Sequence, residues 1–438
     1  NHMDQFTFYK DKNGNEEFEL GFMQNFMFYN GEMNCEIAGE KKGFANLGSA
    51  FRIRMKIDTD RMEKSLQRIF DENEMLRIVA VQKGKYSYMQ KIVTNYKFHL
   101  DVFDAEGNTP EEKYNNAIAK ATEIMQQYID CYHNISAHPF LIRLAEDDYF
   151  FVVVTHHWVG DGASLGIIMG QIFKYYMNPH AETVPSGSYL DYLEEERTFK
   201  FSEKGQKELE FWKNEFDGYQ KIDLSKATIG EPGSSEDLSF SIDISKASKI
   251  AAVKKTSVFQ VILLAYHVGL DVVIGESDVA IGATSACRSN KYLNTVGFFA
   301  HSAFHRLQLT DSDNLYEQLG TSVQKHSKAM SNIHTTFDFY DNMQFCISYL
   351  PGSSSKKGGL DFEQIPIPSV REVAVFYLCA FEYPDKMLLD FIGSGRIFTT
   401  KFRYMLRDAI VSTLEVMYDN ENATVADVKK YYAEKYGK

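Results

Sequence analysis

The ten residues VVTHHWVGDG at positions 153–162 decide how this sequence is interpreted. They overlap the run YFFVVVT (149–155), whose continuous aromatic and β-branched residues are typical of a strand buried on both faces. Beyond the turn at 160–162, apolar residues recur at helical spacing until Asn178-Pro179 stops the pattern: Leu165, Ile168, Ile172, Phe173 and Tyr176. The stretch therefore predicts a strand-turn-helix junction, which can present side chains at the rim of a sheet.

The two adjacent histidines of this junction, His156 and His157, are candidates for proton-transfer chemistry. Imidazole exchanges protons near neutral pH, and one well-placed histidine acting as a general base accelerates a reaction by about 10²- to 10⁴-fold. The sequence holds no cysteine close to the histidines and no third ligand for a zinc site. Two interpretations stay open: a histidine that acts directly on an incoming nucleophile, and a buried histidine with a structural role.

The remaining residues of the turn are predicted to support the histidines. Asp161 lies between two glycines and is expected to be a structural anion, either paired with an arginine or capping the helix that follows. Gly162 is expected because a side chain there would clash or block access.

Length and composition narrow the class of protein. The chain has 438 residues, which predicts two domains of about 150 to 250 residues each. Its net charge of -13 disfavours a nucleic-acid partner, because binding phosphate needs an excess of Lys and Arg. The 5 cysteines are widely spaced without a CxxC pair, so we expect no disulfide framework and a cytoplasmic setting. No apolar run reaches the ~20 residues of a membrane span.

Strand and helix patterns alternate along the chain and predict a mixed α/β fold. Strands are expected at 51–57, 76–81, 238–243 and 278–283. Helices are expected after Thr59, which can cap the first of them, over 257–274 and near the C-terminus. The proline-containing segment 178–188 is the expected linker, which divides the chain into domains 1–180 and 181–438. The stretch 351–359, PGSSSKKGG, predicts a surface loop.

The motif HHxxxDG at residues 156–162 resembles that of the condensation domains of nonribosomal peptide synthetases, which belong to the chloramphenicol acetyltransferase superfamily. Further segments follow in the family's order. ENEMLRIVAV (72–81) is similar to RHExLRxxF, YLDYLEEERTF (189–199) to YxDYAxW, and the segment 259–289 to the one that ends in GxPxxxR, with Arg288 retained. VGFFAHSAFHRLQL (296–309) resembles IGFFVNTLPLR, with Arg306 retained and His301 in place of the family's Asn.

The resemblance implies a pseudo-dimer of two chloramphenicol-acetyltransferase-like subdomains in a V shape, with the active site in a tunnel between them. Donor and acceptor carrier proteins would dock at opposite tunnel ends, each delivering a phosphopantetheine thioester, and no metal or bound cofactor is implied. By the same resemblance, His157 deprotonates or positions the acceptor amine, and His156 is structural. Asp161 pairs with Arg306 and holds the loop.

The sequence also departs from the family's pattern. Residues 332–345 match the family's HQDxPFE-type stretch poorly, and His301 is either a polar stand-in or a second functional imidazole. The residues expected to line a substrate tunnel are Trp158, Ala163, His301 and Ser302, with core packing as the alternative role for Trp158.

Three hypotheses for function remain. The first is an amide-forming condensation enzyme that joins a donor acyl or peptidyl thioester to the amine of a carrier-bound aminoacyl thioester. We expect an N-terminal starter or free-standing unit, because residues 1–3 resemble a vector remnant that ends at a native start, Met3.

The second hypothesis is an ester-forming acyltransferase that uses acyl-CoA or acyl-carrier thioesters, although its plant-type branch is disfavoured because no DFGWG motif occurs. The third is a non-catalytic module that docks carrier proteins, against which the intact His157, Asp161 and Gly162 weigh. The favoured first hypothesis describes a monomeric protein of secondary metabolism whose partners are acyl and peptidyl carrier proteins or acyl-CoA.

Overall fold

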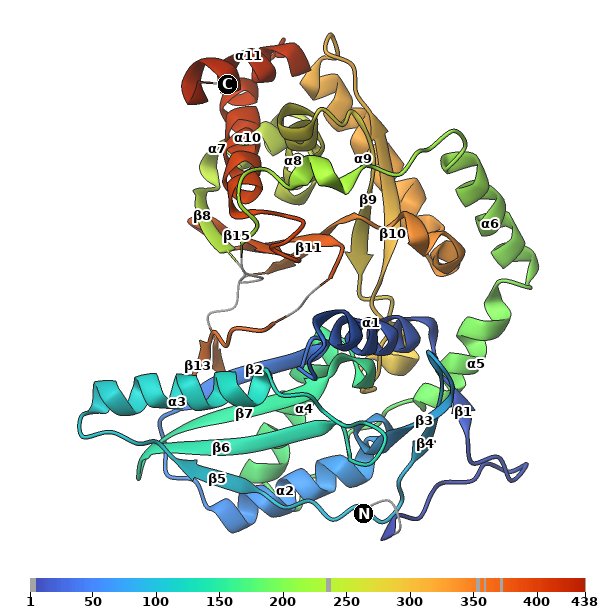
Figure 1. Ribbon diagram of the computed structural model, residues 1–438, viewed down its shortest axis with the longest axis vertical. Coiled ribbons are helices and arrows are strands. Elements are labelled where there is room, and N and C mark those ends of the chain that lie inside the picture. The colour runs from blue at the N-terminus through green and yellow to red at the C-terminus, as the bar shows by residue number, and fades with distance from the viewer. Residues whose placement is uncertain (1–4, 234–237, 352–354, 358–359, 371–372, 438) are drawn as a thin grey trace. The chain divides into compact units, whose positions relative to one another are not determined.

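The computed structural model divides the chain into two compact units (Figure 1). It describes residues 5–233, 238–351, 355–357, 360–370 and 373–437. Unit 1 comprises Asn1–Arg197, Ala286–Ala300 and Ser354–Arg371, and unit 2 comprises Thr198–Ser285, His301–Ser353 and Glu372–Lys438. The sequence placed one division after residue 180, whereas unit 1 continues to Arg197 and includes two later segments. These segments belong to unit 1 because residues 286–300 bond to the histidine motif and residues 360–365 extend the sheet of unit 1.

The main sheet of unit 1 brings the histidine motif to its rim. Its strand order is β12-β13-β2-β7-β6-β5. The strands are β2 (Asn46–Ile53), β5 (Asp101–Asp104), β6 (Ala137–Ala145), β7 (Asp148–His156), β12 (Ser355–Lys357) and β13 (Leu360–Ile365). β7 is antiparallel to β2 and β6, and every residue of β7 after Asp148 is buried, as predicted. Asn46 of β2 lies opposite His156, the last residue of β7.

The helices of unit 1 bury most of the apolar residues that the sequence singled out. They are α1 (Phe22–Ala38), α2 (Thr59–Glu72), α3 (Pro110–Met125) and α4 (Gly162–Met177), followed by α5 (Tyr189–Phe199). α3 packs against β2, β6 and β7, whereas α4 packs against β2 and α2 (Figure 1). Leu165, Ile168 and Ile172 of α4 are buried, as the helical spacing predicted. A second sheet in unit 1 has the order β1 (Phe18–Glu19), β4 (Ser87–Ile92), β3 (Ile78–Gly84).

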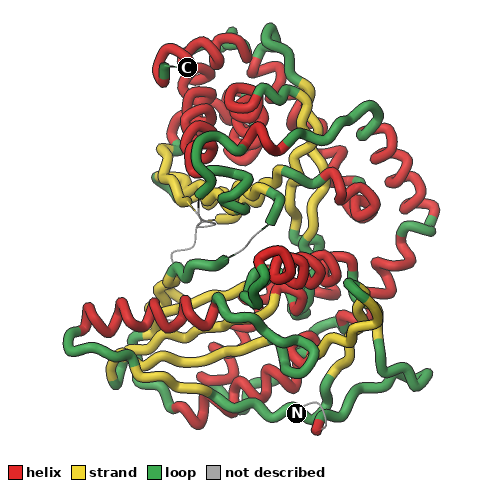
Figure 2. The backbone as a smooth tube through the Cα atoms, viewed as in Figure 1, coloured by secondary structure: helices red, strands yellow, loops and turns green. Residues whose placement is uncertain are grey.

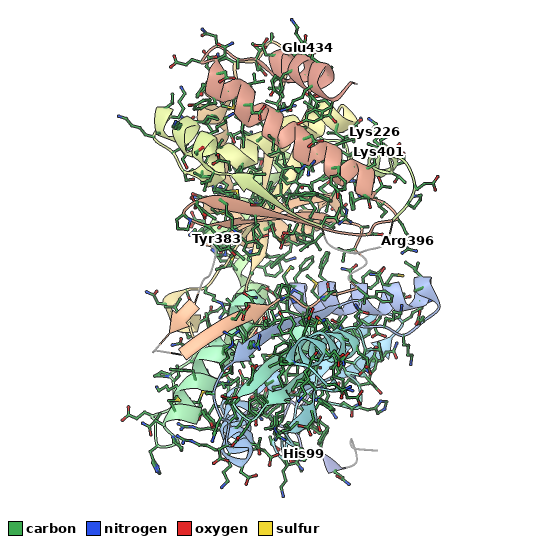
Figure 3. The ribbon with its side chains drawn as sticks, turned by 90° about the vertical axis from the view of Figure 1, so that its left-hand side faces the viewer. His99, Lys226, Tyr383, Arg396, Lys401 and Glu434 are labelled. Atoms are coloured by element: carbon green, nitrogen blue, oxygen red, sulfur yellow. The ribbon has the colours of Figure 1, made fainter. Side chains whose placement is uncertain are left out.

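Unit 2 is built on a six-stranded sheet of order β10-β9-β11-β14-β15-β8 (Figure 2). Its strands are β8 (Leu238–Asp243), β9 (Asp278–Ser285), β10 (His301–Gln308), β11 (Phe345–Pro351), β14 (Phe376–Glu382) and β15 (Lys386–Ile392). Its helices are α6 (Glu203–Glu215), α7 (Ser245–Val253), α8 (Val258–Ile274), α9 (Leu315–Ser331), α10 (Thr400–Asp419) and α11 (Val425–Tyr436). α8 packs against α7, α9, α10 and α11 and is almost wholly buried, whereas Lys401 of α10 and Glu434 of α11 are exposed (Figure 3). Both units are therefore mixed α/β, as predicted.

Two local expectations differ from the structure. The strand predicted at 51–57 is β2, which ends at Ile53, the last residue that pairs with β7. Thr59 was expected to cap the following helix, but the cap is Asp58, whose side chain accepts a hydrogen bond from the backbone N–H of Arg61. The side chain of Asp58 satisfies a free backbone N–H of the first turn, so the helix begins at Thr59.

The predicted loop at 351–359 lies partly outside the described residues. Within the described part, Pro351 ends β11 and Ser355–Lys357 forms β12, which pairs with β13. This part of the stretch is therefore strand, because β13 offers an antiparallel partner immediately after it.

No single helix of the described residues is long and apolar enough to cross a membrane. α7 and α8 together meet that length and composition, but they are bent by 101° at their junction. α8 lies in the hydrophobic core of unit 2.

Candidate active site

His156 is a buried, neutral residue at the end of β7. It is 5% exposed, and its Nδ1 accepts a hydrogen bond from the backbone N–H of Trp158 at 3.0 Å. Burial, together with the neighbouring His157, lowers the pKa of His156 to about 3. Its ring centroid lies 5.2 Å from that of Phe28, and Gly31 permits this packing because a Cβ there would lie 3.3 Å from Nε2 of His156. This environment fits the structural role expected of the first histidine.

His157 is half-buried and has a defined tautomer. It begins a short 3-10 helix, η3 (His157–Val159), and its backbone N–H donates to the carbonyl of Ala45 at 2.7 Å. Its Nδ1 lies 2.9 Å from the carbonyl oxygen of Gly160. Because a carbonyl only accepts hydrogen bonds, Nδ1 carries the proton and the lone pair of the neutral ring is on Nε2. The ring stacks on Phe298, with centroids 4.8 Å apart and planes inclined by 20°.

Asp161 caps α4 and binds a second segment of unit 1. Its Oδ1 accepts from the backbone N–H of Ser164 at 3.0 Å and from the Arg288 guanidinium at 2.8 Å. Its Oδ2 accepts from the backbone N–H groups of Phe299 and Ala300, each at 3.0 Å. The two alternatives raised for Asp161, a helix cap and a partner of an arginine, are both confirmed.

Arg288 holds the other side of this ion pair. The side chains of Arg288 and Asp161 are 5% and 3% exposed. The guanidinium also donates to the carbonyls of Tyr292 at 2.9 Å and Thr295 at 2.6 Å, and it lies 4.3 Å from the ring centroid of Phe299. Removing only one partner of such a buried ion pair is strongly destabilising, because the other charge stays buried without compensation.

The predicted pairing of Asp161 with Arg306 is wrong. Arg306 lies in β10 of unit 2 and forms a two-pronged ion pair with Asp278, with distances of 2.9 and 2.8 Å. Its remaining nitrogen donates to the carbonyls of Glu215 and Asp217, each at 2.8 Å. β9 and β10 are antiparallel neighbours, so Asp278 is supplied locally.

The glycine whose side chain would clash is not Gly162. A Cβ at Gly162 would meet no described atom within 4 Å, because this residue begins α4 at an exposed position. A Cβ at Gly160 would lie 2.6 Å from Ser164 Oγ, and one at Gly297 would lie 2.2 Å from Cδ1 of Tyr189. The steric requirement therefore belongs to Gly160 and Gly297, while an effect of Gly162 on access stays a prediction.

The four residues expected along a substrate tunnel have different environments. Trp158 is fully buried and its Nε1 donates to Ser136 Oγ at 2.9 Å, which agrees with core packing. Ala163 is exposed at the start of α4. In unit 2, His301 is 3% and Ser302 5% exposed. Their place along a tunnel stays a prediction.

The imidazole of His301 has a structural bond within unit 2. Its Nε2 donates to the carbonyl of Ile333 at 3.0 Å, and its ring centroid lies 4.7 Å from that of Phe337. These contacts support the interpretation that His301 is a structural polar residue in the place of the family's Asn, not a second functional imidazole.

Ser164 was missed as part of the site. Its Oγ accepts from the backbone N–H of Gly297 at 3.0 Å and lies 2.8 Å from the carbonyl oxygen of Gly297. It also lies 3.2 Å from the Arg288 guanidinium. The available signal was its position three residues after Asp161, where a hydroxyl joins the first turn of the helix.

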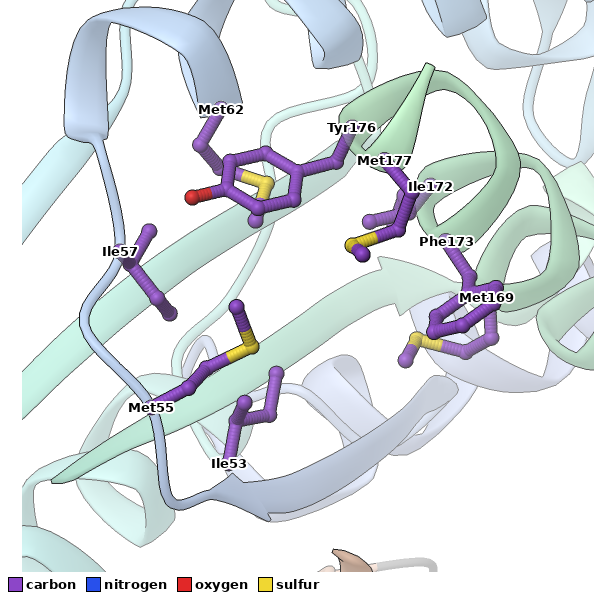
Figure 4. A pocket seen from close by; sticks show the side chains of 9 residues that line it. All are labelled: Ile53, Met55, Ile57, Met62, Met169, Ile172, Phe173, Tyr176 and Met177. Carbon is purple, nitrogen blue, oxygen red and sulfur yellow. The ribbon is translucent and has the colours of Figure 1, made fainter. Parts of the chain in front are cut away.

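A separate apolar hollow lies in unit 1 between the end of β2, α2 and α4 (Figure 4). The hollow is open to solvent, and Met55, Met62, Met169 and Met177 are among its lining residues. Ile53, also in its wall, pairs with Tyr149, which places it roughly 23 Å along the strands from His156. The hydroxyl of Tyr176 there accepts the backbone N–H of Asp58, so the residues that line the hollow offer no evident acid or base. It is distinct from the histidine site.

Among the described residues, no group of three or more His, Cys, Asp or Glu side chains is placed to hold a metal ion. The chemistry that the described motif offers is that of the His157 imidazole, held by the Gly160 carbonyl and the Phe298 ring.

Comparison with known proteins adds a family match to this geometry. The model of the condensation domain matches residues 18–345. The chain is 25% identical over 313 residues to bacitracin synthase 1 of Bacillus licheniformis, an alignment that covers 68% of this chain and 6% of that protein. It is 24% identical over 378 residues to bacitracin synthase 2 of the same organism, covering 80% and 14%. The chain therefore corresponds to a small part of the length of these synthases.

Solved structures share the fold at low identity. The SgcC5 protein of Streptomyces globisporus has a TM-score of 0.75 and 17% identity, covering 93% of this chain and 100% of that one. The starter condensation domain of rhizomide synthetase RzmA, as a double mutant, has a TM-score of 0.76 and 14% identity, covering 94% and 96%.

Proposed function

Because this chain belongs to the condensation-domain family of nonribosomal peptide synthesis, we propose that it forms an amide bond. The donor is an acyl or peptidyl thioester, and the acceptor is the amine of a carrier-bound aminoacyl thioester. The observation that carries the proposal is the Nδ1–H of His157 donating to the Gly160 carbonyl, which leaves the lone pair on Nε2. A general base needs a lone pair aimed at the nucleophile's proton.

The proposed reaction is a direct transfer without a covalent enzyme intermediate. The acceptor nitrogen attacks the thioester carbonyl carbon while Nε2 of His157 takes the proton that this nitrogen loses. The tetrahedral intermediate then collapses, so that the C–N bond is kept and the C–S bond breaks. The leaving thiolate takes the proton from the imidazolium, which restores the neutral ring.

The substrates are proposed to arrive on phosphopantetheine arms, borne by carrier proteins or by CoA. The RzmA starter domain was solved in complex with C8-CoA and Leu-SNAC, an acyl thioester and an aminoacyl analogue. This supports an N-acylating, starter-type role for the present chain, with acyl-carrier protein or acyl-CoA as donor and a carrier-bound aminoacyl group as acceptor.

Ester formation is the second candidate. SgcC5 was solved in complex with a naphthyl ethanediol, which bears hydroxyl groups. A hydroxyl needs the same removal of a proton as an amine, so His157 would serve either nucleophile. A role restricted to docking carrier proteins is less well supported, because docking does not require the buried Asp161–Arg288 pair beside a defined imidazole tautomer.

The test follows the acyl group by intact-protein mass spectrometry. A panel of acyl-carrier and acyl-CoA donors is offered to an aminoacyl-loaded carrier and, separately, to hydroxyl acceptors. His157→Ala is compared with His99→Ala, an exposed histidine of unit 1 (Figure 3). We expect acylation of the carrier-bound amine by the wild type and the His99 variant and its loss in the His157 variant. Product only with hydroxyl acceptors would replace amide by ester formation, and no product with bound carriers would favour docking.

A further inference from the structure

The ring of Phe298 restrains the tilt of the His157 imidazole, which the hydrogen bond of His157 to Gly160 does not restrain. The Nδ1–H bond to Gly160 fixes the direction of Nε2 within the plane of the ring. The near-parallel Phe298 ring, at 4.8 Å and 20°, limits how far that plane can tilt. Together the two contacts define the position of Nε2 of His157. Phe298 is 4% exposed, so its own freedom to move is small.

The backbone next to Phe298 is held to the motif by hydrogen bonds. Gly297 bonds to Ser164 through both its N–H and its carbonyl, and its carbonyl also accepts from the backbone N–H of Asp161 at 3.2 Å. The carbonyl of Phe298 accepts from the Tyr189 hydroxyl at 2.7 Å.

The two residues after Phe298 are fastened to the same carboxylate. The backbone N–H groups of Phe299 and Ala300 donate to Oδ2 of Asp161. Arg288, earlier in the same stretch of unit 1, donates to Oδ1 of the same side chain. These hydrogen bonds hold the segment 297–300 in place, and this segment carries the Phe298 ring that stacks on His157.

We propose that Phe298 is a positioning residue for His157, and that Asp161 and Arg288 act on the imidazole through the segment that carries Phe298. Asp161 accepts from two backbone N–H groups of this segment, and Arg288 holds the carboxylate of Asp161 in place. The inference rests on the proposed function only for its kinetic test, since the restraint itself exists without substrate.

The kinetic test compares Phe298→Leu with Phe298→Tyr. Leu keeps much of the apolar volume but removes the ring, whereas Tyr keeps the ring. We expect Phe298→Leu to lower kcat by about 10- to 100-fold with little change in KM, because a misplaced base affects the reacting geometry more than substrate binding. The Phe298→Tyr variant should retain most of the wild-type kcat, because it keeps the aromatic ring.

The matched control is Phe70→Leu. Phe70 is a buried ring of unit 1 that is stacked on Phe98 at 5.1 Å and 19°, a geometry close to that of Phe298 on His157. Its loss is expected to lower stability without lowering kcat. Equal kcat losses in the Phe70 and Phe298 variants would reduce the role of Phe298 to packing and overturn the proposal.

A second measurement needs no turnover. Nitrogen-15 NMR of labelled histidines reports which ring nitrogen of His157 is protonated, and proton shifts report the shielding by an aromatic face. In the wild type we expect protonated Nδ1 and shielded ring protons. Phe298→Leu should populate both tautomers, because a tilted imidazole makes a poorer hydrogen bond to the Gly160 carbonyl, whereas Phe70→Leu should leave the tautomer unchanged. A tautomer population in Phe298→Leu that equals that of the wild type overturns the positioning role, even if the protein proves to catalyse no condensation.

Discussion

His156 and His157 are neighbours in the chain but hold opposite tautomers. Nδ1 of His156 accepts from the Trp158 backbone, whereas Nδ1 of His157 donates to the Gly160 carbonyl. The first ring, at the end of β7, is buried, whereas the second belongs to the first residue of the 3-10 helix and is half-buried. Backbone groups thereby set both tautomers, which supports the proposed division between a structural His156 and a catalytic His157.

The buried His156 makes unit 1 sensitive to acid. Its pKa is about 3 in the folded state against 6.5 for an unperturbed histidine. Between pH 6.5 and about 3 the unfolded state therefore binds a proton that the folded state does not, so stability falls as the pH falls through this range, by about 1.4 kcal/mol per pH unit at most.

His156→Asn keeps a hydrogen-bond acceptor for Trp158 but does not titrate in this range. Urea denaturation at a series of pH values from neutral to acid should show a shallower loss of stability in this variant. Identical pH dependence in wild type and variant would mean that His156 is not the group responsible.

Glu196 has the opposite effect on the pH dependence. Its carboxylate accepts the backbone N–H of Phe22 at 3.1 Å, and burial raises its pKa from 4.5 to about 7. Between these values the folded state keeps a proton that the unfolded state releases, so this contribution to stability is full below pH 4.5 and is lost as the pH rises through 7. Glu196→Gln retains the acceptor oxygen and should remove this slope, as followed by thermal denaturation. If the loss of stability with rising pH persists in the variant, another titrating group is responsible for it.

The identity of the partner of Asp161 can be tested by a double-mutant cycle. Asp161→Asn leaves the Arg288 guanidinium buried without its counter-charge, and we expect a loss of about 3 to 5 kcal/mol in the free energy of unfolding. The double variant Asp161→Asn/Arg288→Met should lose much less free energy of unfolding than the sum of the losses in the two single variants. Adding Arg306→Met should be additive, because Arg306 pairs with Asp278. Coupling of Asp161 to Arg306 and not to Arg288 would contradict the structure.

Two glycines of the site should respond differently to a single methyl group. Gly297→Ala places a Cβ 2.2 Å from the Tyr189 ring and is expected to cost about 1 to 3 kcal/mol. Gly162→Ala meets no described atom within 4 Å and should change stability by less than about 0.5 kcal/mol. Melting temperatures of both variants test this, and a large loss in Gly162→Ala would restore the clash first expected there.

The junction itself was predictable because its signals are local. The β-branched run of β7 and the apolar spacing of α4 are confirmed, whereas the turn between them is the 3-10 helix His157–Val159 and Gly162 already belongs to α4. The cap formed by Asp161 follows from the same local pattern. Local chemistry therefore placed both histidines at the rim of the sheet correctly.

The partners that come from distant segments were not predictable. Arg288 lies 127 residues after Asp161, and choosing it over Arg306 requires knowing that residues 286–300 return to unit 1. The stacking of Phe298 on His157 depends on the same return. No periodicity or spacing encodes such a path, which is set by packing between elements.

The proposed role of His157 as the general base is tested most directly by the single-turnover rate of acyl transfer to a carrier-bound amine. His157→Gln is compared with His99→Gln, with circular dichroism to confirm that both variants fold. We expect the His157 variant to be slower by about 10²- to 10⁴-fold and the His99 variant to match the wild type. A His157 variant that transfers the acyl group at the wild-type rate would contradict the assignment.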